Sequence, residues 1–279
     1  MSFCWSFSQR RAVLPLTLLV ATLQAVAAEK GGDGNDAQPG SGDPFSSKWN
    51  ILLGAGAING PRYPGSNINF TRGFPAVSAT YGRYFLGAVS GGGAPAGLGA
   101  YLVRTEHWTV GVDVGGGAFK PRRASDAPIL HGWGSIPGTV HGGMFASYSI
   151  EWLSVRGAVS GAGHNEGVEA TLGFDANYRV TSRFTLSIGP EVTWVDGQNA
   201  MTFFGIDAAQ SKIAGVVPYR ARSGVSAVMG QASARYMLTN HWSLGAHASY
   251  GRLQGDAANS PVTADKTQRV YAAFVMYHF

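Results

Sequence analysis

Apolar and polar side chains alternate with a period of two residues along most of this chain. Residues 167–179 show the pattern well, because each apolar residue is followed by a polar, charged or glycine residue. The apolar set is Val168, Ala170, Leu172, Phe174, Ala176 and Tyr178, and the other set is Glu169, Thr171, Gly173, Asp175, Asn177 and Arg179. Successive side chains of a strand point to opposite faces, so this pattern predicts a strand with one apolar and one polar face.

The alternation recurs in a series of segments that are separated by turn residues. The predicted strands are 49–58, 73–81, 84–91, 97–104, 107–119, 139–150, 151–161, 167–179, 183–198, 223–237, 242–254 and 268–279. The connections between them alternate between long and short, and the long ones are 59–72, 92–96, 120–138, 162–166, 199–222 and 255–267. Outer-membrane barrels have an even number of antiparallel strands, short periplasmic turns and longer outer loops. The sequence therefore predicts an all-β fold, an antiparallel transmembrane β-barrel of about 12 strands, with about 10 or 14 as alternatives.

The composition agrees with strands that face lipid on one side and a polar lumen on the other. Charged residues make up only 13% of the chain, whereas soluble proteins contain about 25%. Mean hydropathy is nevertheless close to zero, at +0.01, and no apolar run reaches about 18 residues beyond the first 28. A helical membrane protein would contain such runs and a soluble enzyme would carry more charge, so both classes are disfavoured.

The beginning of the chain has the features of an export signal. Arg10 and Arg11 precede the apolar run 12–23, and small residues follow up to Ala28. This order is typical of a secretory signal peptide, so we expect residues 1–28 to be removed. Residues 29–48 are rich in Gly, Asp, Ser and Pro and are predicted to be a disordered periplasmic leader, which leaves 49–279 for the barrel.

Aromatic residues mark the short-turn ends of the predicted strands. An amphipathic ring gains from both lipid and water, so these residues are predicted to form an interfacial girdle. The girdle comprises Trp108, Tyr148, Tyr178, Phe184, Tyr236, Trp242 and Tyr277. The last strand resembles the closing strand that the assembly machinery of outer-membrane barrels recognises, with Tyr271, Tyr277 and Phe279 as the assembly signal.

Charged residues on the predicted inner faces of the strands are few. They are Asp113, Arg156, Asp175, Glu191 and Arg235. Isolated charges inside a narrow lumen are costly, so opposite charges there are expected to pair. We predict a lumen charge network in which Arg156 and Arg235 face Asp175 and Glu191. Such a network either fills the interior of a small barrel or forms the selectivity constriction of a channel.

No pattern in the sequence indicates catalysis, a cofactor or a metal site. The seven histidines lack metal-ligand spacing, although His141 and His247 are expected to point into the lumen. Ser243 shares the lumen face of its strand with His247, but no acidic residue lies nearby in the sequence. A basic cluster is absent as well, so nucleic acid is not an expected partner. The expected partners are outer-membrane lipid and the barrel assembly machinery.

Three stretches resemble one family of outer-membrane proteins. They are Pro61-Arg-Tyr-Pro-Gly-Ser66, Tyr219-Arg-Ala-Arg-Ser-Gly224 and Arg252-Leu-Gln-Gly-Asp-Ala-Ala-Asn-Ser-Pro-Val262. Together they are similar to the MltA-interacting protein family, also called the outer-membrane protein V (MipA/OmpV) family, over residues 49–279. The resemblance implies a barrel in the Gram-negative outer membrane. It also implies the founding role of the family, a scaffold that links a lytic murein transglycosylase to a murein synthase.

The predicted function follows from this resemblance. The chain is expected to be a scaffold rather than an enzyme, with the periplasmic turns and residues 29–48 as its contact surface. Two alternatives remain open, a channel for small solutes and a surface adhesin that uses the long loops 120–138 and 199–222.

Overall fold

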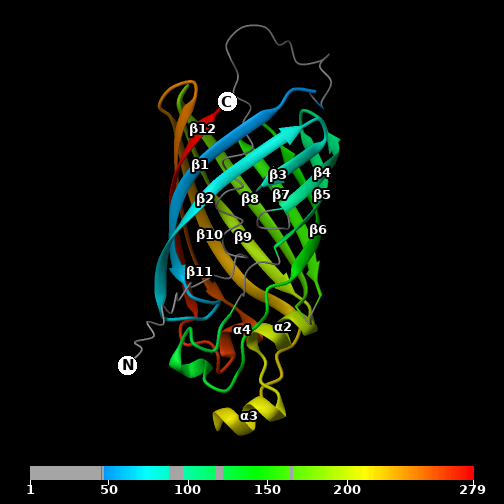
Figure 1. Ribbon diagram of the computed structural model, residues 1–279, viewed down its shortest axis with the longest axis vertical. Helices are drawn as coiled ribbons and strands as arrows, with labels where there is room; N and C mark the ends of the chain where they lie inside the picture. Colours follow the sequence, from blue (N-terminus) through cyan, green and yellow to red (C-terminus); the bar gives the residue numbers. More distant parts are fainter. Residues whose placement is uncertain (1–44, 46, 88–96, 117–121, 164–165) are drawn as a thin grey trace, which may run out of the picture.

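Twelve antiparallel strands form a closed barrel (Figure 1). The computed structural model describes residues 45, 47–87, 97–116, 122–163 and 166–279. Each strand pairs with its neighbours in the sequence, and β1 pairs with β12 to close the ring. The strands are β1 (Asn50–Pro61), β2 (Asn69–Tyr81), β3 (Tyr84–Gly87), β4 (Gly97–Arg104), β5 (Trp108–Gly116), β6 (Val140–Ser149), β7 (Leu153–Ala162), β8 (Gly167–Thr181), β9 (Phe184–Val195), β10 (Gly224–Met237), β11 (Trp242–Leu253) and β12 (Thr267–His278). The fold class and the strand number predicted from the alternation are confirmed.

The strand boundaries of the described residues lie within a few residues of their predicted positions, and the strand predicted over 183–198 ends three residues early. β9 stops at Val195, and the Asp196 carboxylate accepts a hydrogen bond of 2.7 Å from the backbone N–H of Asn199. An acidic side chain in this position caps a helix, so the chain turns into α2 (Gly197–Phe204) instead of extending the strand. Residues 88–91 and 117–119 of the predicted strands lie outside the described residues.

The outer face carries exposed apolar side chains on every strand of the ring. Leu98 is 60% exposed, Met144 is 58% exposed and Ile188 is 64% exposed, so these large apolar side chains do not pack in a protein core. One such residue from each strand in order is Leu53, Val77, Leu86, Leu98, Val114, Met144, Val159, Leu172, Ile188, Val228, Leu244 and Tyr271. Soluble monomers rarely expose contiguous apolar patches larger than a few hundred Å². We call this set the apolar belt.

The inner face is only partly polar, which corrects the expectation of a polar lumen. On the side of β12, the inward residues Val270 and Ala272 pack against Ile58 of β1, and the cluster is buried. Phe274 and Met276 continue this apolar wall towards β2. A second buried apolar group consists of Phe85, Tyr101 and Phe145. Most of the buried polar side chains of the described strands lie on β7, β10 and β11.

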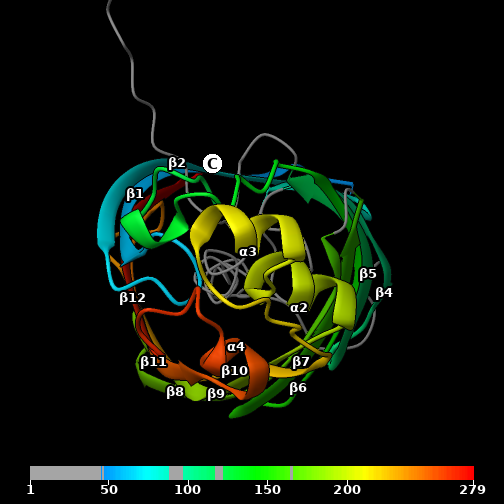
Figure 2. The same cartoon turned by 90° about the horizontal axis from the view of Figure 1, so that it is seen from below.

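The long connections fold over one mouth of the barrel (Figures 1 and 2). They contain a short 3-10 helix, η2 (Pro128–Leu130), and the helices α2, α3 (Ala208–Ala214) and α4 (Gly255–Asn259). We call residues 62–68, 122–139, 196–223 and 254–266 the cap. Its centre is a buried cluster of Tyr63, Ala127, Leu130, Trp133, Ile206 and Val262. Because these side chains come from four connections, the connections form one packed unit with a core of its own.

Polar contacts tie the parts of the cap together. The Arg122 guanidinium is buried and donates a hydrogen bond of 2.8 Å from Nη1 to the backbone oxygen of Phe203 in α2. Burial lowers the pKa of Arg122 to about 10, so the group still carries its positive charge at neutral pH. At the other side of the cap, the Arg222 guanidinium lies 3.1 Å from Asp256, and this hydrogen bond lowers the pKa of the carboxyl.

The opposite end of the barrel carries only short turns. The connections there are residues 82–83, 105–107, 150–152, 182–183 and 238–241. Asn50 begins β1 and His278 ends β12 at this same end (Figure 1). The predicted alternation of connection length is confirmed except at residues 163–166, a connection no longer than the short turn 238–241. All the helices of the described structure lie on the long side. Among the described residues, no helix combines the length and the apolarity that a membrane crossing by a helix requires.

Candidate functional site

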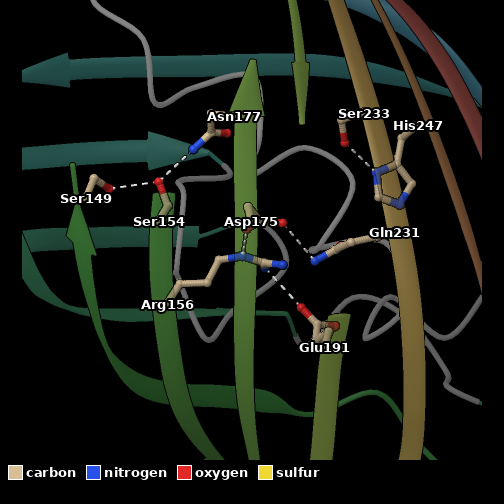
Figure 3. A network of polar contacts seen from close by, with 9 residues as sticks. All are labelled: Ser149, Ser154, Arg156, Asp175, Asn177, Glu191, Gln231, Ser233 and His247. Carbon is tan, nitrogen blue, oxygen red and sulfur yellow. Dashed lines mark hydrogen bonds and ion pairs between the residues drawn. The ribbon is translucent and has the colours of Figure 1, made fainter. Parts of the chain in front are cut away.

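A charged cluster lies inside the barrel on three neighbouring strands (Figure 3). Arg156 of β7 donates a hydrogen bond of 2.7 Å from Nε to Oδ2 of Asp175 on β8. It donates a second one, of 3.0 Å, from Nη1 to Oε2 of Glu191 on β9. The three side chains are only 10%, 15% and 15% exposed. The cluster is therefore a largely buried ion triad, in which one guanidinium neutralises one of two carboxylate charges.

The sheet register explains why this arginine reaches two strands. Gly173 of β8 lies directly between Arg156 and Glu191 in the cross-strand row. A Cβ atom at Gly173 would meet the guanidinium, at 2.8 Å from Nη2 and 2.9 Å from Cζ. The missing side chain thus opens the path along which the guanidinium passes over β8.

Gly173→Ala is expected to lower the free energy of unfolding by about 1–3 kcal/mol, since overpacking forces neighbouring groups out of position. Urea unfolding of the refolded barrel, followed by tryptophan fluorescence, measures the change. Gly230→Ala is the matched control, because a Cβ there would meet its nearest atom, a backbone oxygen, at an ordinary 3.7 Å. Equal stability of the two variants would contradict the role of Gly173.

Other polar side chains surround the triad (Figure 3). Gln231 of β10 donates a hydrogen bond of 3.4 Å from Nε2 to the free oxygen, Oδ1, of Asp175. Further along the wall, Ser233 Oγ and His247 Nδ1 lie 2.9 Å apart, and His247 is buried. Ser149, Ser154 and Asn177 join in a separate chain of hydrogen bonds of 3.0 Å. Polar groups thus continue on both sides of the triad along this wall.

The structure brings together three of the five residues predicted for the lumen network. Asp113 is buried on β5, opposite Gly99 and Gly143. Arg235 lies close to the short-turn end of β10, opposite Thr185 and Gly245. The contacts that define the triad come from the other three residues, so a shared network with Asp113 and Arg235 stays a prediction.

The serine and histidine residues considered for catalysis have different partners from those that the sequence suggests. Ser243 Oγ lies 3.0 Å from Nε2 of His278 on the adjacent strand, and Ser243 is buried. His247, on the same face as Ser243, contacts Ser233 instead. No acidic side chain within the described part of the chain is hydrogen-bonded to either histidine, so the described contacts form no Ser-His-acid relay of the kind used for nucleophilic catalysis.

A cavity of about 110 Å³ lies between the triad and the cap. Glu191 of the triad lines it, together with His141, Glu166 and Glu169. Phe203 and Phe204 of α2 contribute cap residues to its wall. Polar lining residues from the barrel strands are Ser160, Thr171, Thr193, Ser226, Gln231, Ser249 and Gln268. The cavity therefore lies where the lumen meets the cap, with acidic groups on the barrel side and aromatic groups from the cap.

The pair Glu166 and Glu169 was not singled out in the sequence. Glu166 lies in a predicted connection and Glu169 on a predicted inner face, and neither has a charged neighbour in the sequence that would mark it. The feature of the sequence that could have indicated an acidic site is the spacing of these two glutamates, with Gly167 and Val168 between them at the start of a strand. Gly167 has a φ of +67°, a value that favours glycine, and this turn directs the Glu166 carboxylate back into the barrel.

The predicted girdle residues lie at the short-turn end, and most are exposed. Trp108, Tyr178 and Tyr236 are 49%, 69% and 44% exposed, and Trp242 is 44% exposed. Several of the rings pair across strands, as in Trp108 and Tyr148, Phe184 and Tyr236, and Trp242 and Tyr277. Of the predicted assembly signal, Tyr271 and Phe279 are exposed. Their roles in membrane insertion stay predictions.

Comparison with known proteins gives one family match and several similar structures. The family model described as MltA-interacting protein MipA matches residues 53–279. No curated protein sequence matches the chain. Among solved structures, the chain is similar to the NanC porin, with 9% identity, 82% of this chain and 99% of that chain covered, and a TM-score of 0.38. An outer-membrane channel from Pseudomonas putida F1 is 10% identical, with 87% of this chain and 100% of that chain covered and a TM-score of 0.40. OmpT, an outer-membrane protein of Vibrio cholerae, is 9% identical, with 87% of this chain and 100% of that chain covered and a TM-score of 0.37.

Proposed function

Because this chain belongs to the family of the MltA-interacting protein MipA, we propose that it is an outer-membrane scaffold for periplasmic murein enzymes. Its first partner would be a lytic murein transglycosylase, held at the short-turn end of the barrel, and its second a murein synthase. The family match over residues 53–279 is the observation that carries the proposal. Residues 1–28 would direct export, and residues 29–48 would extend the contact surface.

The apolar belt supports the location in a membrane. Each strand contributes exposed apolar side chains to it, and the ring has no free strand edge. Hydrocarbon offers no partners for backbone N–H and C=O groups, so only structures that satisfy these groups internally can span it. A closed barrel with an apolar exterior meets this condition, and bacterial barrels of this type lie in the outer membrane.

The short-turn end supports the contact with periplasmic partners. In outer-membrane barrels the short turns face the periplasm, so the cap would face outward. Three exposed arginines lie at this end, Arg83, Arg179 and Arg183. The exposed acidic side chains of the described short turns are two, Glu106 and Glu151. A surface with more basic than acidic side chains can guide the approach of an acidic patch on a partner.

Arg83→Glu combined with Arg183→Glu is expected to weaken capture of the transglycosylase by about three- to tenfold, because both arginines lie in the short turns themselves. The measurement is a pull-down of the tagged, detergent-solubilised barrel with the lytic transglycosylase of the same bacterium, followed by a titration of the purified pair.

The matched control is Lys212→Glu combined with Arg220→Glu, which makes the same charge change on exposed cap residues at the other end. This control is expected to bind like the unmodified barrel. A barrel that captures no murein enzyme at native expression levels would contradict the scaffold proposal. Equal loss in both double variants would contradict the assignment of the contact to the short-turn end.

A further inference from the structure

The cavity under the cap contains a buried carboxylate that the protein does not satisfy. Glu166 is 1% exposed, and its Oε1 atom has no hydrogen-bond partner among the described residues. The other oxygen, Oε2, lies 3.0 Å from Nε2 of His141, which is the one close polar contact of the carboxylate in the described part of the chain. A buried carboxylate without compensating partners is costly, so native proteins rarely keep one unless something pairs with it.

Glu166 is held in this position by its backbone. The side chain of Asn199 in α2 donates a hydrogen bond of 2.8 Å from Nδ2 to the backbone oxygen of Glu166. Asn199 is itself fixed, because its backbone N–H donates a hydrogen bond to the Asp196 carboxylate, which caps α2. These hydrogen bonds join α2 to the start of β8 and hold the Glu166 carboxylate towards the cavity.

Two more carboxylates line the same cavity. The Glu169 carboxylate has no hydrogen bond or ion pair to any described residue, and the Glu191 carboxylate accepts a hydrogen bond from Arg156 of the triad. Since Arg156 also faces Asp175, its single positive charge is already shared between two carboxylates. No lysine or arginine is among the residues that line the cavity in the described structure. The buried cap cation Arg122 donates to the backbone oxygen of Phe203. Negative charge therefore exceeds positive charge around the cavity.

Part of the remaining wall of the cavity is apolar. Phe203 and Phe204 come from α2, whereas Met229 and Leu253 come from β10 and β11. A hard metal cation prefers oxygen ligands on all sides, which the apolar part of this wall does not supply. An organic ammonium ion fits it better, because the charged head can bond to the carboxylates while an alkyl chain contacts the aromatic and aliphatic side chains.

We propose that the cavity under the cap binds a small alkylammonium ion, with Glu166 and Glu169 as the groups that accept its N–H bonds. Glu191 adds a third carboxylate, and Phe203 and Met229 cover the alkyl chain. The volume of about 110 Å³ suits a ligand of a few carbon atoms with one or two amino groups, since a cavity of about 150 Å³ holds a benzene molecule. This inference is independent of the scaffold role, which concerns the opposite end of the barrel.

The experiment is isothermal titration calorimetry of the full barrel, refolded in a non-ionic detergent, with 1,4-diaminobutane as the probe. We expect saturable binding of the diamine, and none of butane-1,4-diol, which has the same chain without charge. Glu166→Gln and Glu169→Gln are each expected to weaken binding at least about tenfold, because each replaces a charged acceptor of the ammonium N–H by a neutral one. Glu151→Gln, at an exposed carboxylate in a short turn, is the matched control and should bind like the unmodified barrel.

Heat-modifiable migration on gels shows whether each variant is folded. If one of the two glutamine variants does not fold, diamine binding by the other still tests the proposal. Absence of diamine binding at millimolar concentration would overturn the proposal, as would unchanged affinity in both glutamine variants. Tighter binding of Mg²⁺ or Ca²⁺ that depends on the same two glutamates would overturn the assignment to an organic cation. None of these outcomes affects the pull-down of murein enzymes, so the two proposals fail separately.

Discussion

Replacing Arg156 by alanine is expected to lower the free energy of unfolding by about 3–5 kcal/mol, because it removes the cation of a buried ion cluster and leaves the carboxylates uncompensated. Asp175 and Glu191, each 15% exposed in the intact barrel, would lose the hydrogen bonds of 2.7 and 3.0 Å that they accept from the guanidinium. Two like charges would then face each other in a region of low dielectric. The midpoint of urea unfolding in detergent or lipid vesicles measures the loss.

Two further variants separate the charge effect from loss of packing. Arg179→Ala removes an exposed arginine near the short turns and is expected to change stability by no more than about 0.5 kcal/mol. Adding Asp175→Asn and Glu191→Gln to Arg156→Ala should restore part of the stability, because neutral amides no longer need a cation. If Arg156→Ala were as stable as Arg179→Ala, the triad would not contribute to the fold.

The same variant also addresses the channel alternative. If the triad is a constriction of an open pore, the single-channel conductance in planar bilayers will change when Arg156 is replaced. A barrel that conducts in neither form would remove the channel hypothesis, and the triad would then serve to fill the interior.

Leu172→Arg is expected to destabilise the barrel in lipid by about 2–4 kcal/mol, the cost of an arginine on the lipid face near the centre of the bilayer. Leu172 is 47% exposed and belongs to the apolar belt of β8, well away from the turn that ends this strand. Val180→Arg places the same charge on the same strand near the short-turn end, where Val180 is 43% exposed. There the expected cost is only about 0–1 kcal/mol, since the charge can reach the headgroup region.

The difference between these two variants tests the membrane location of the belt. Urea unfolding of each barrel in lipid vesicles gives the two free energies under the same conditions. In a water-soluble protein, arginine at either exposed position would change stability by about 0.5 kcal/mol or less. Equal and small effects at Leu172 and Val180 would therefore rule out a lipid-facing belt.

Most of the fold could be predicted because the side-chain period of a strand is local. Parity along β8 places Leu172 outside and Asp175 inside without any knowledge of neighbouring strands. The same rule fails on β12, where Tyr271 and Phe274 point to opposite faces and both faces are apolar. Alternation alone could not show that Phe274 faces an apolar wall of the lumen, which only the packing against β1 and β2 decides.

The helices of the cap are shorter than the segments in which a helical period can be recognised. Asp207 begins α3 with a capping box, in which its side chain accepts from the backbone of Gln210 and the Gln210 side chain accepts from the backbone of Asp207. This signal is present in the sequence, and so is the cap at Asp196. The loop 199–222 was nevertheless expected to be a plain outer loop, because seven or eight residues give too few turns for a period.

The sequence by itself determined a twelve-stranded barrel with an apolar exterior and long connections at one mouth, because strand parity and turn spacing are written in consecutive residues. It also placed Arg156, Asp175 and Glu191 on inner faces. Only the tertiary structure decided that Gly173 lets Arg156 reach both carboxylates, and that Glu166 and Glu169 line one cavity together with residues of α2. These contacts depend on the register between strands and on the folding of the cap, and both join residues that are distant in the chain.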